Sequence, residues 1–198
     1  MRLRLKAALL TTVLAFPASA GAAWAEGPTE TVQAAVAQVF TESSAVQAEA
    51  ASPAERRTHI LEAAERLFDF REMARRCLGN YFDALSRPDQ TEFVRLFTNL
   101  IAASYMGKIE AYTGESIRYL DEQVDGIDAK VNSRLVTRKG TEVDVAYRLY
   151  HAGDRWAVYD VSVDGVSLVD NYKIQFSRFI HRNSLSEFLK TLQQRAGS

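Results

Sequence analysis

The sequence predicts an α+β protein in which helices and strands occupy separate stretches of the chain. Apolar residues recur every three or four positions from about residue 29 to 113, and again after residue 167, as in amphipathic helices. Between residues 115 and 164 they recur every two positions, as in half-buried strands. Short turns separate these segments, and consecutive strands joined by short turns form an antiparallel meander, here of four strands.

The first 25 residues have the three-part pattern of a secretory signal peptide. Residues 1–6 (MRLRLK) are basic, residues 7–16 (AALLTTVLAF) are apolar, and small residues follow Pro17. Ten apolar residues are too few to span a bilayer core of about 30 Å. Ala-x-Ala cleavage sites end at Ala20 and Ala25, and we favour Ala25 because the polar Glu26 would then begin the mature chain.

The charge of the mature chain, residues 26–198, argues against a nucleic-acid partner. The whole chain has 24 basic residues, of which three lie in the signal segment, so 21 remain against 25 acidic residues, a net charge of -4. Binding to a phosphate backbone requires a basic surface instead. The chain has one cysteine, Cys77, which excludes an internal disulfide and a multi-cysteine metal site.

Capping signals mark the first helices. The apolar spacing predicts a helix from Thr29 to about Ala50. Ser52-Pro53-Ala54-Glu55 has the form of a capping box with proline at the first helical position, so a second helix begins there. Asp69 begins a third helix, which Gly79 ends.

The longest apolar stripe follows the turn at Ser86-Arg87-Pro88 and predicts a helix that ends at Gly114. Its apolar face comprises Phe93, Leu96, Phe97, Leu100, Ile101, Tyr105, Ile109 and Tyr112.

Four segments have strand character. They are Ile117–Tyr119, Val131–Val136, Thr141–Tyr150 and Arg155–Val163, with turns at Asp125-Gly126, Lys139-Gly140 and Gly153-Asp154. The alternation is cleanest in the third, where Val143, Val145, Tyr147 and Leu149 share one face. Gly165 then turns the chain, Ser167 caps a helix, and Ser184-Leu185-Ser186-Glu187 opens the last one.

No catalytic motif accompanies these elements. The sequence contains no Gly-x-Ser-x-Gly, His-Glu-x-x-His or phosphate-binding glycine loop, and its three histidines lie on different elements. Cys77 lies in an apolar stripe, so we expect a small buried side chain rather than a reactive thiol. Asp160 interrupts an apolar strand, for which structural pairing is the favoured explanation. Several tyrosines lie in apolar stripes, where they fit either a core or a cavity rim.

The C-terminal half resembles a known family. The run Trp156–Val169 (WAVYDVSVDGVSLV), followed by Asn171-Tyr172-Lys173 and Gln175-Phe176, is similar to the periplasmic MlaC and toluene-tolerance lipid-binding proteins. Upstream matches are Cys77–Tyr81, Pro88-Asp89-Gln90 with Phe93, Phe97 and Tyr105, and Tyr147-Arg148-Leu149. Two positions depart from the family pattern. Lys173 stands where arginine is usual, and Leu67-Phe68 precedes Asp69-Phe70 where proline is frequent, which leaves the hopanoid-associated branch open.

The resemblance implies a periplasmic carrier without enzymatic activity, which shuttles phospholipid between the outer and inner membranes and maintains outer-membrane lipid asymmetry. The implied fold is an NTF2-like cone, with a four-stranded curved antiparallel sheet wrapped by helices and completed by a helical subdomain. The implied partners are phospholipid, an inner-membrane ABC transporter complex and an outer-membrane lipoprotein–porin complex, the last two in transient contact. We expect a monomer with no cofactor and no metal.

A lipid carrier requires an apolar cavity, because each acyl-chain methylene that is buried away from water contributes about 0.8 kcal/mol to binding. We expect the strand face and the helix stripes opposite it to line that cavity. The candidate lipid-binding residues are Phe97, Leu100, Ile101, Tyr105, Val143, Val145, Tyr147, Leu149, Val158, Leu168, Tyr172 and Phe176.

Three alternatives remain. An isomerase or dehydratase of the same cone fold would use Asp160 with Tyr147 or Tyr159 as acid and base, and would need a carboxyl pKa raised by a dry pocket. A periplasmic adaptor would instead dock a protein on its apolar surface. A lipid-binding protein of the hopanoid pathway would keep the carrier fold but take another lipid.

Overall fold

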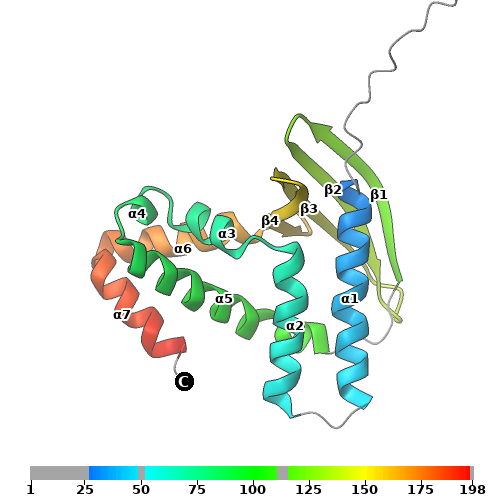
Figure 1. The fold of residues 1–198 in the computed structure, drawn as a ribbon, viewed down its shortest axis with the longest axis horizontal. Helices are drawn as coiled ribbons and strands as arrows, with labels where there is room; N and C mark the ends of the chain where they lie inside the picture. The colour runs from blue at the N-terminus through cyan, green and yellow to red at the C-terminus, as the bar shows by residue number, and fades with distance from the viewer. Residues whose placement is uncertain (1–26, 49–51, 111–115, 197–198) are drawn as a thin grey trace, which may run out of the picture.

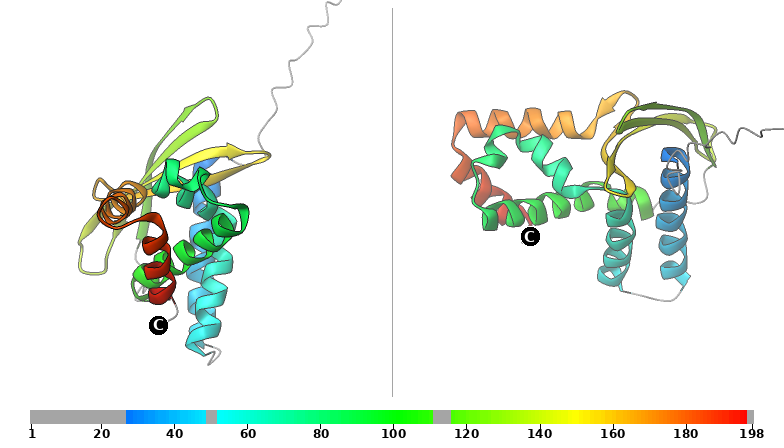
Figure 2. Two further views of the ribbon diagram at one scale, coloured as in Figure 1. Left: turned by 90° about the vertical axis from the view of Figure 1, so that its left-hand side faces the viewer. Right: turned by 45° about the horizontal axis from the view of Figure 1, so that its top comes forward.

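The protein consists of two groups of helices joined by a curved sheet (Figures 1 and 2). The structure is a computed structural model, and it describes residues 27–48, 52–110 and 116–196. The predicted signal segment, Tyr112 and Gly114 therefore lie outside the described residues. Among the residues described, no helix has both the length and the hydropathy that crossing a membrane requires.

The first helical group covers one face of the sheet. It comprises α1 (Pro28–Ala48) and α2 (Pro53–Leu67), which lie side by side (Figure 1). The predicted capping box is confirmed, because the Ser52 side chain accepts a hydrogen bond from the Glu55 N–H and the Glu55 carboxylate accepts one from the Ser52 N–H.

The second helical group lies beside the sheet. It comprises α3 (Phe70–Leu78), α4 (Asn80–Asp83), α5 (Arg87–Glu110), α6 (Leu168–Arg182) and α7 (Leu185–Ala196). α3 begins and ends where predicted: Asp69 is its N-cap, and Gly79 ends it with a φ of 58°, in the region that glycine favours. Sequence reasoning missed α4, because a four-residue helix is too short to show a period.

The sheet is antiparallel in the order β1-β2-β3-β4-β5. Its strands are β1 (Ser116–Asp125), β2 (Asp128–Val136), β3 (Glu142–Ala152), β4 (Arg155–Val163) and β5 (Val166–Ser167). The α+β class is confirmed, but the prediction of four strands is wrong by one. Asp164 and Gly165 both have positive φ, as a type I′ hairpin turn requires, and this tight turn folds Val166 and Ser167 back onto β4.

The edge strand β1 is longer than its sequence suggested. The prediction covered Ile117–Tyr119, whereas pairing with β2 continues to Asp125. The residues beyond Tyr119 are all exposed, so they lack the alternation that identifies a half-buried strand. Their strand conformation comes from the backbone hydrogen bonds of the neighbouring strand.

A bulge in β4 changes which of its side chains face the helices. Leu149 pairs with Val158 but Arg148 pairs with Asp160, so Tyr159 is an extra residue in the ladder. Val161, opposite Tyr147, therefore lies on the same face as Val158 although three positions separate them. Asp160 consequently points to the other face of the strand.

Two large apolar clusters form the core. The helical cluster is built by α3, α5, α6 and α7 around Phe93, whose side chain is fully buried. The sheet cluster packs α1 and α2 on β2, β3 and β4, with Val32, Val131 and Leu149 fully buried. The region where the two clusters meet contains the site described next.

Candidate functional site

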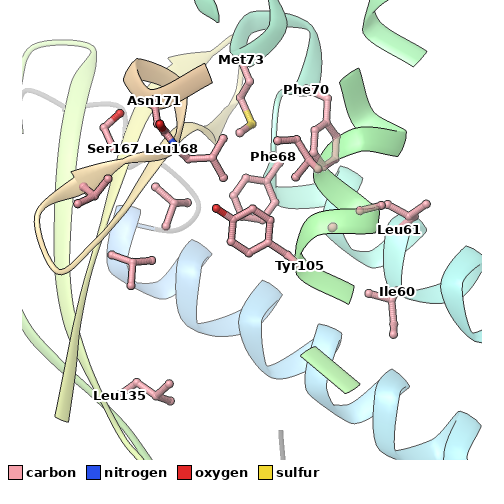
Figure 3. Close-up of a pocket in the computed structure, with 16 residues that line it drawn as sticks. Ile60, Leu61, Phe68, Phe70, Met73, Tyr105, Leu135, Ser167, Leu168 and Asn171 are labelled. Atoms are coloured by element: carbon pink, nitrogen blue, oxygen red, sulfur yellow. The ribbon is translucent and has the colours of Figure 1, made fainter. Parts of the chain in front are cut away.

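An apolar pocket of about 410 Å³ lies between the two clusters (Figure 3). We call it the central pocket. Its walls come from α2, the turn between α2 and α3, α5, the sheet and the start of α6. The lining residues are Ile60, Leu61, Ala64, Phe68, Phe70, Met73, Ile101, Ala102, Tyr105, Leu135, Val161, Val163, Val166, Ser167, Leu168 and Asn171.

The central pocket has almost no polar wall. None of its lining residues carries a formal charge at neutral pH, and Tyr105, Ser167 and Asn171 are the polar ones. Burial raises the pKa of Tyr105, so its hydroxyl stays protonated. The Ser167 hydroxyl is already engaged, because it donates to Asp160 and accepts from the Asp170 N–H. Such a wall binds by excluding water from an apolar ligand.

The open side of the pocket is marked by its exposed lining residues, Val163, Val166 and Asn171. Val163 and Val166, on either side of the β4–β5 turn, are 42% and 64% exposed. No lining residue places a charge in the path of an apolar ligand that enters here, while the exposed Asp164 lies in the turn itself.

Asp160 fixes the wall where β4 passes into α6. Its side chain is 2% exposed and accepts hydrogen bonds from the Ser167 hydroxyl at 2.7 Å and the Val169 N–H at 3.0 Å. These bonds satisfy the buried carboxylate and hold the first turn of α6, from which Leu168 and Asn171 reach the pocket. The structure thus confirms the structural pairing that was favoured for Asp160.

The turn from α2 to α3 fixes the opposite wall. The backbone of Phe68 forms an isolated parallel β-bridge with that of Val158, and the Asp69 N–H donates a hydrogen bond to the Val158 carbonyl at 2.9 Å. The Asp69 carboxylate also accepts from the Glu72 N–H and from the Tyr150 hydroxyl. Because Phe68 and Phe70 flank this tethered residue, their rings are held at the pocket.

The Tyr150 contact predicts a loss of stability at alkaline pH. Burial, together with the hydrogen bond to the Asp69 carboxylate, raises the pKa of Tyr150 to about 12, above the ordinary value of 10.0. The folded state therefore holds this proton more tightly than the unfolded state. The stability that protonated Tyr150 contributes to the fold is complete below pH 10 and is lost as the pH rises towards 12.

Urea unfolding of the wild type and of Tyr150→Phe at successive pH values tests this expectation. We expect the variant to be less stable at pH 8, and its stability to fall less steeply than that of the wild type above pH 10. Parallel curves for the two proteins would show that the tyrosine does not titrate as described.

The structure distributes the predicted lipid-binding residues over both clusters. Ile101, Tyr105 and Leu168 line the central pocket. Phe97, Leu100, Tyr172 and Phe176 belong to the helical cluster, and Val145, Tyr147, Leu149 and Val158 to the sheet cluster, while Val143 is half-buried opposite Leu135. A contact of these other residues with ligand stays a prediction.

The strand register explains the difference between the predicted and the observed lining. Val145 pairs with Val163, Tyr147 with Val161 and Val143 with Leu135, and in each pair the second residue lines the pocket. The predicted residues of β3 therefore lie on the correct face of the sheet, but the residues that line the pocket are their partners on the neighbouring strands, β2 and β4.

The predicted set also omitted most of the helical wall. It contained no residue from α2 or from the turn that follows it, although Ile60, Ala64 and Phe68 formed a visible stripe in the sequence. That stripe indicated a buried face, but nothing local to it indicated which neighbour the face would meet.

The enzyme alternative relied on groups that lie outside the central pocket. Tyr147 is in the sheet cluster, and burial raises its pKa. Asp160 and Tyr159 line a second hollow of about 280 Å³, where the Arg76 guanidinium stacks on the Tyr159 ring at 3.8 Å. Within the described residues, no group of three or more metal-ligating side chains is placed to hold an ion.

Cys77 is buried as predicted. Its thiol is 3.5 Å from the Val169 carbonyl, and burial, reinforced by the charges of Asp160 and Asp170, strongly raises its pKa. A thiol held in this protonated form is a poor nucleophile.

Comparisons with known proteins agree on one family. The model of the MlaC protein family matches residues 33–194. The intermembrane phospholipid transport system binding protein MlaC of Haemophilus influenzae is 23% identical over 124 residues, which make up 60% of this chain and 58% of that protein. The chain thus aligns with less than two thirds of that relative's length.

A solved structure has the same fold. It is that of a phospholipid-binding protein from Ralstonia solanacearum in complex with a phospholipid, with a TM-score of 0.77 and 21% identity. The match covers 84% of this chain and 95% of the other.

Proposed function

Because the chain belongs to the MlaC protein family, we propose that it binds phospholipid in the central pocket and carries it between the two membranes of a bacterium. The observation that carries the proposal is the pocket itself, whose lining is apolar and without formal charge. It has the polarity of an acyl chain rather than that of a polar metabolite. The names of the two similar proteins, one a phospholipid transport protein and one a phospholipid-binding protein, support the same ligand.

The energetics suit a carrier. Burying an acyl chain gains about 0.8 kcal/mol per methylene, which offsets the loss of the bilayer environment without any specific polar contact. The phosphate head group then stays in water outside the apolar rim formed by Val163 and Val166. This arrangement accounts for the lack of catalytic and phosphate-binding motifs in the sequence.

The cellular role follows from the same proposal. The signal-like first 25 residues support a periplasmic location. There the protein would receive lipid from an outer-membrane lipoprotein–porin complex and deliver it to an inner-membrane ABC transporter complex, maintaining lipid asymmetry. Both contacts would be brief, because a carrier that binds a partner stably does not turn over.

Lipid extraction tests the function. The protein is purified without detergent and extracted with organic solvent, and the extract is analysed by mass spectrometry. We expect about one phospholipid per chain. A pentacyclic lipid in its place would identify the hopanoid branch, a polar metabolite would support an isomerase or dehydratase, and an empty extract would favour the adaptor.

A further inference from the structure

The outer face of α6 carries a row of cations that the central pocket does not use. Lys173, Ile174, Ser177, Arg178, His181 and Arg182 follow the spacing of one helical face and line a shallow hollow there. We call this set the α6 basic face. The opposite face of α6 is buried, with Val169, Phe176 and Ile180 in the helical cluster. In Figure 2 (right), α6 lies along the edge of the helical group, where no other described element covers its outer side.

The arginines of this face have no acidic partner in the described residues, and Lys173 at its start also lines the second hollow, with Asp83, Asp160 and Asp170. Within the described residues, Lys173, Arg178 and Arg182 form no ion pair, whereas Arg75 and Arg76 pair with Glu72 and Arg134 pairs with Asp144. Asp170 is the one acid of α6, and it lies in the first turn. A chain with a net charge of -1 thus concentrates positive charge on one helix face.

An apolar residue lies among the cations. Ile174 is 53% exposed, next to Lys173 and one turn before Arg178. Lysine and arginine have long apolar stems that keep their charges in water while a neighbouring apolar side chain lies deeper. Basic side chains beside an exposed apolar one also occur where helices bind anionic membranes, with the apolar side chain in the head-group boundary.

We propose that the α6 basic face docks the protein on a bilayer surface that contains anionic lipids. The head-group region of such a bilayer supplies both anionic charge for the cations and an apolar layer for Ile174, so it accounts for both features of this face. The first turn of α6 supplies Leu168 and Asn171 to the central pocket, so docking along α6 places that pocket beside the membrane. The inference extends the proposed function, and its test separates the two.

Vesicle co-sedimentation provides the test. The protein, expressed from its full coding sequence, is mixed with vesicles of phosphatidylglycerol and phosphatidylcholine, or of phosphatidylcholine alone. We expect binding to the anionic vesicles alone, and its loss when the salt rises from about 0.1 M to about 1 M, since the Debye length falls from about 10 Å to about 3 Å.

Two arginine substitutions locate the contact. Each cation near an anionic surface increases binding about fivefold, so Arg178→Gln/Arg182→Gln is expected to weaken binding by about 25-fold. The matched control is Lys130→Gln/Lys139→Gln, which removes two exposed charges from β2 and the β2–β3 turn. We expect this control to bind as the wild type does. Ile174→Ser is expected to weaken binding without changing its dependence on salt.

Each outcome decides between the hypotheses. The α6 assignment is overturned if the wild type binds both kinds of vesicle equally, or if the two double variants lose equal amounts of vesicle binding. Co-purified lipid is measured in every sample, and Arg178→Gln/Arg182→Gln is expected to retain it. A protein that contains lipid but binds no vesicles refutes docking and supports the carrier function. A protein that binds vesicles through α6 but contains no lipid supports docking and refutes the carrier function.

Discussion

Ala102→Trp is expected to remove most of the bound phospholipid while leaving the protein folded. Ala102 is 6% exposed and lines the central pocket from α5, so an indole at this position fills the space that an acyl chain would use. Overfilling a packed site costs about 1–3 kcal/mol, and about 1.4 kcal/mol lowers affinity tenfold. If bound lipid meets the indole at that cost, its affinity falls by about fivefold to about 150-fold.

The neighbouring residue provides a matched control. Ala103 is exposed on the same helix, so Ala103→Trp introduces the same side chain on the solvent side. Bound phospholipid per chain is measured for both variants, and thermal melting is measured after delipidation, because bound lipid itself raises the melting temperature. If Ala102→Trp melts much lower than Ala103→Trp and retains its lipid, the position is ordinary core. Ala102→Leu fills less of the pocket, so we expect it to lower the amount of bound phospholipid less than Ala102→Trp does.

Phe93→Ala is expected to cost about 3–5 kcal/mol of stability, the largest effect of a single substitution that the structure indicates. Phe93 is fully buried, and its ring lies 6.1–6.3 Å from the rings of Phe82, Phe97, Phe176 and Phe188. It thereby joins α4, α5, α6 and α7. Truncation leaves a cavity where these helices meet, and a cluster of aromatic rings closes such a cavity poorly.

Urea unfolding of the delipidated protein measures this loss. Phe179→Ala is the matched control, because Phe179 is half-buried on α6 and its ring contacts that of Phe188 at 5.8 Å. We expect the control to lose clearly less than Phe93→Ala. Similar losses would mean that Phe93 does not hold the helical group together.

Local chemistry made much of the fold predictable. The Ser52 capping box, the helix end at Gly79 and the turn at Gly153-Asp154 each depend on residues adjacent in sequence, and the structure has all three. Elements without a local signal were missed. The outer part of β1 has no apolar alternation, and β5 exists through the hairpin that attaches it to β4.

The pocket lining was less predictable than the elements because it depends on pairings across the chain. Val145 and Val163 are register partners, and no pattern within either strand shows which one faces the cavity. The bulge at Tyr159 also makes strand alternation misleading in β4. It places Val158 and Val161 on one face, although strict alternation would put them on opposite faces. Polar residues were easier to assign, because a buried carboxylate such as Asp160 must find hydrogen-bond donors.

The dispersed origin of the pocket walls also bears on the order of folding. Ile60 and Asn171 face one cavity although more than half of the chain separates them in sequence. Contacts of such long range form slowly, because the entropy of closing a large loop must be lost before they contribute. In a chain made from its N-terminus, α1 and α2 are complete before the strands that cover them exist. The apolar faces of those helices are exposed during that interval, which makes nascent chains prone to aggregate and dependent on holding factors.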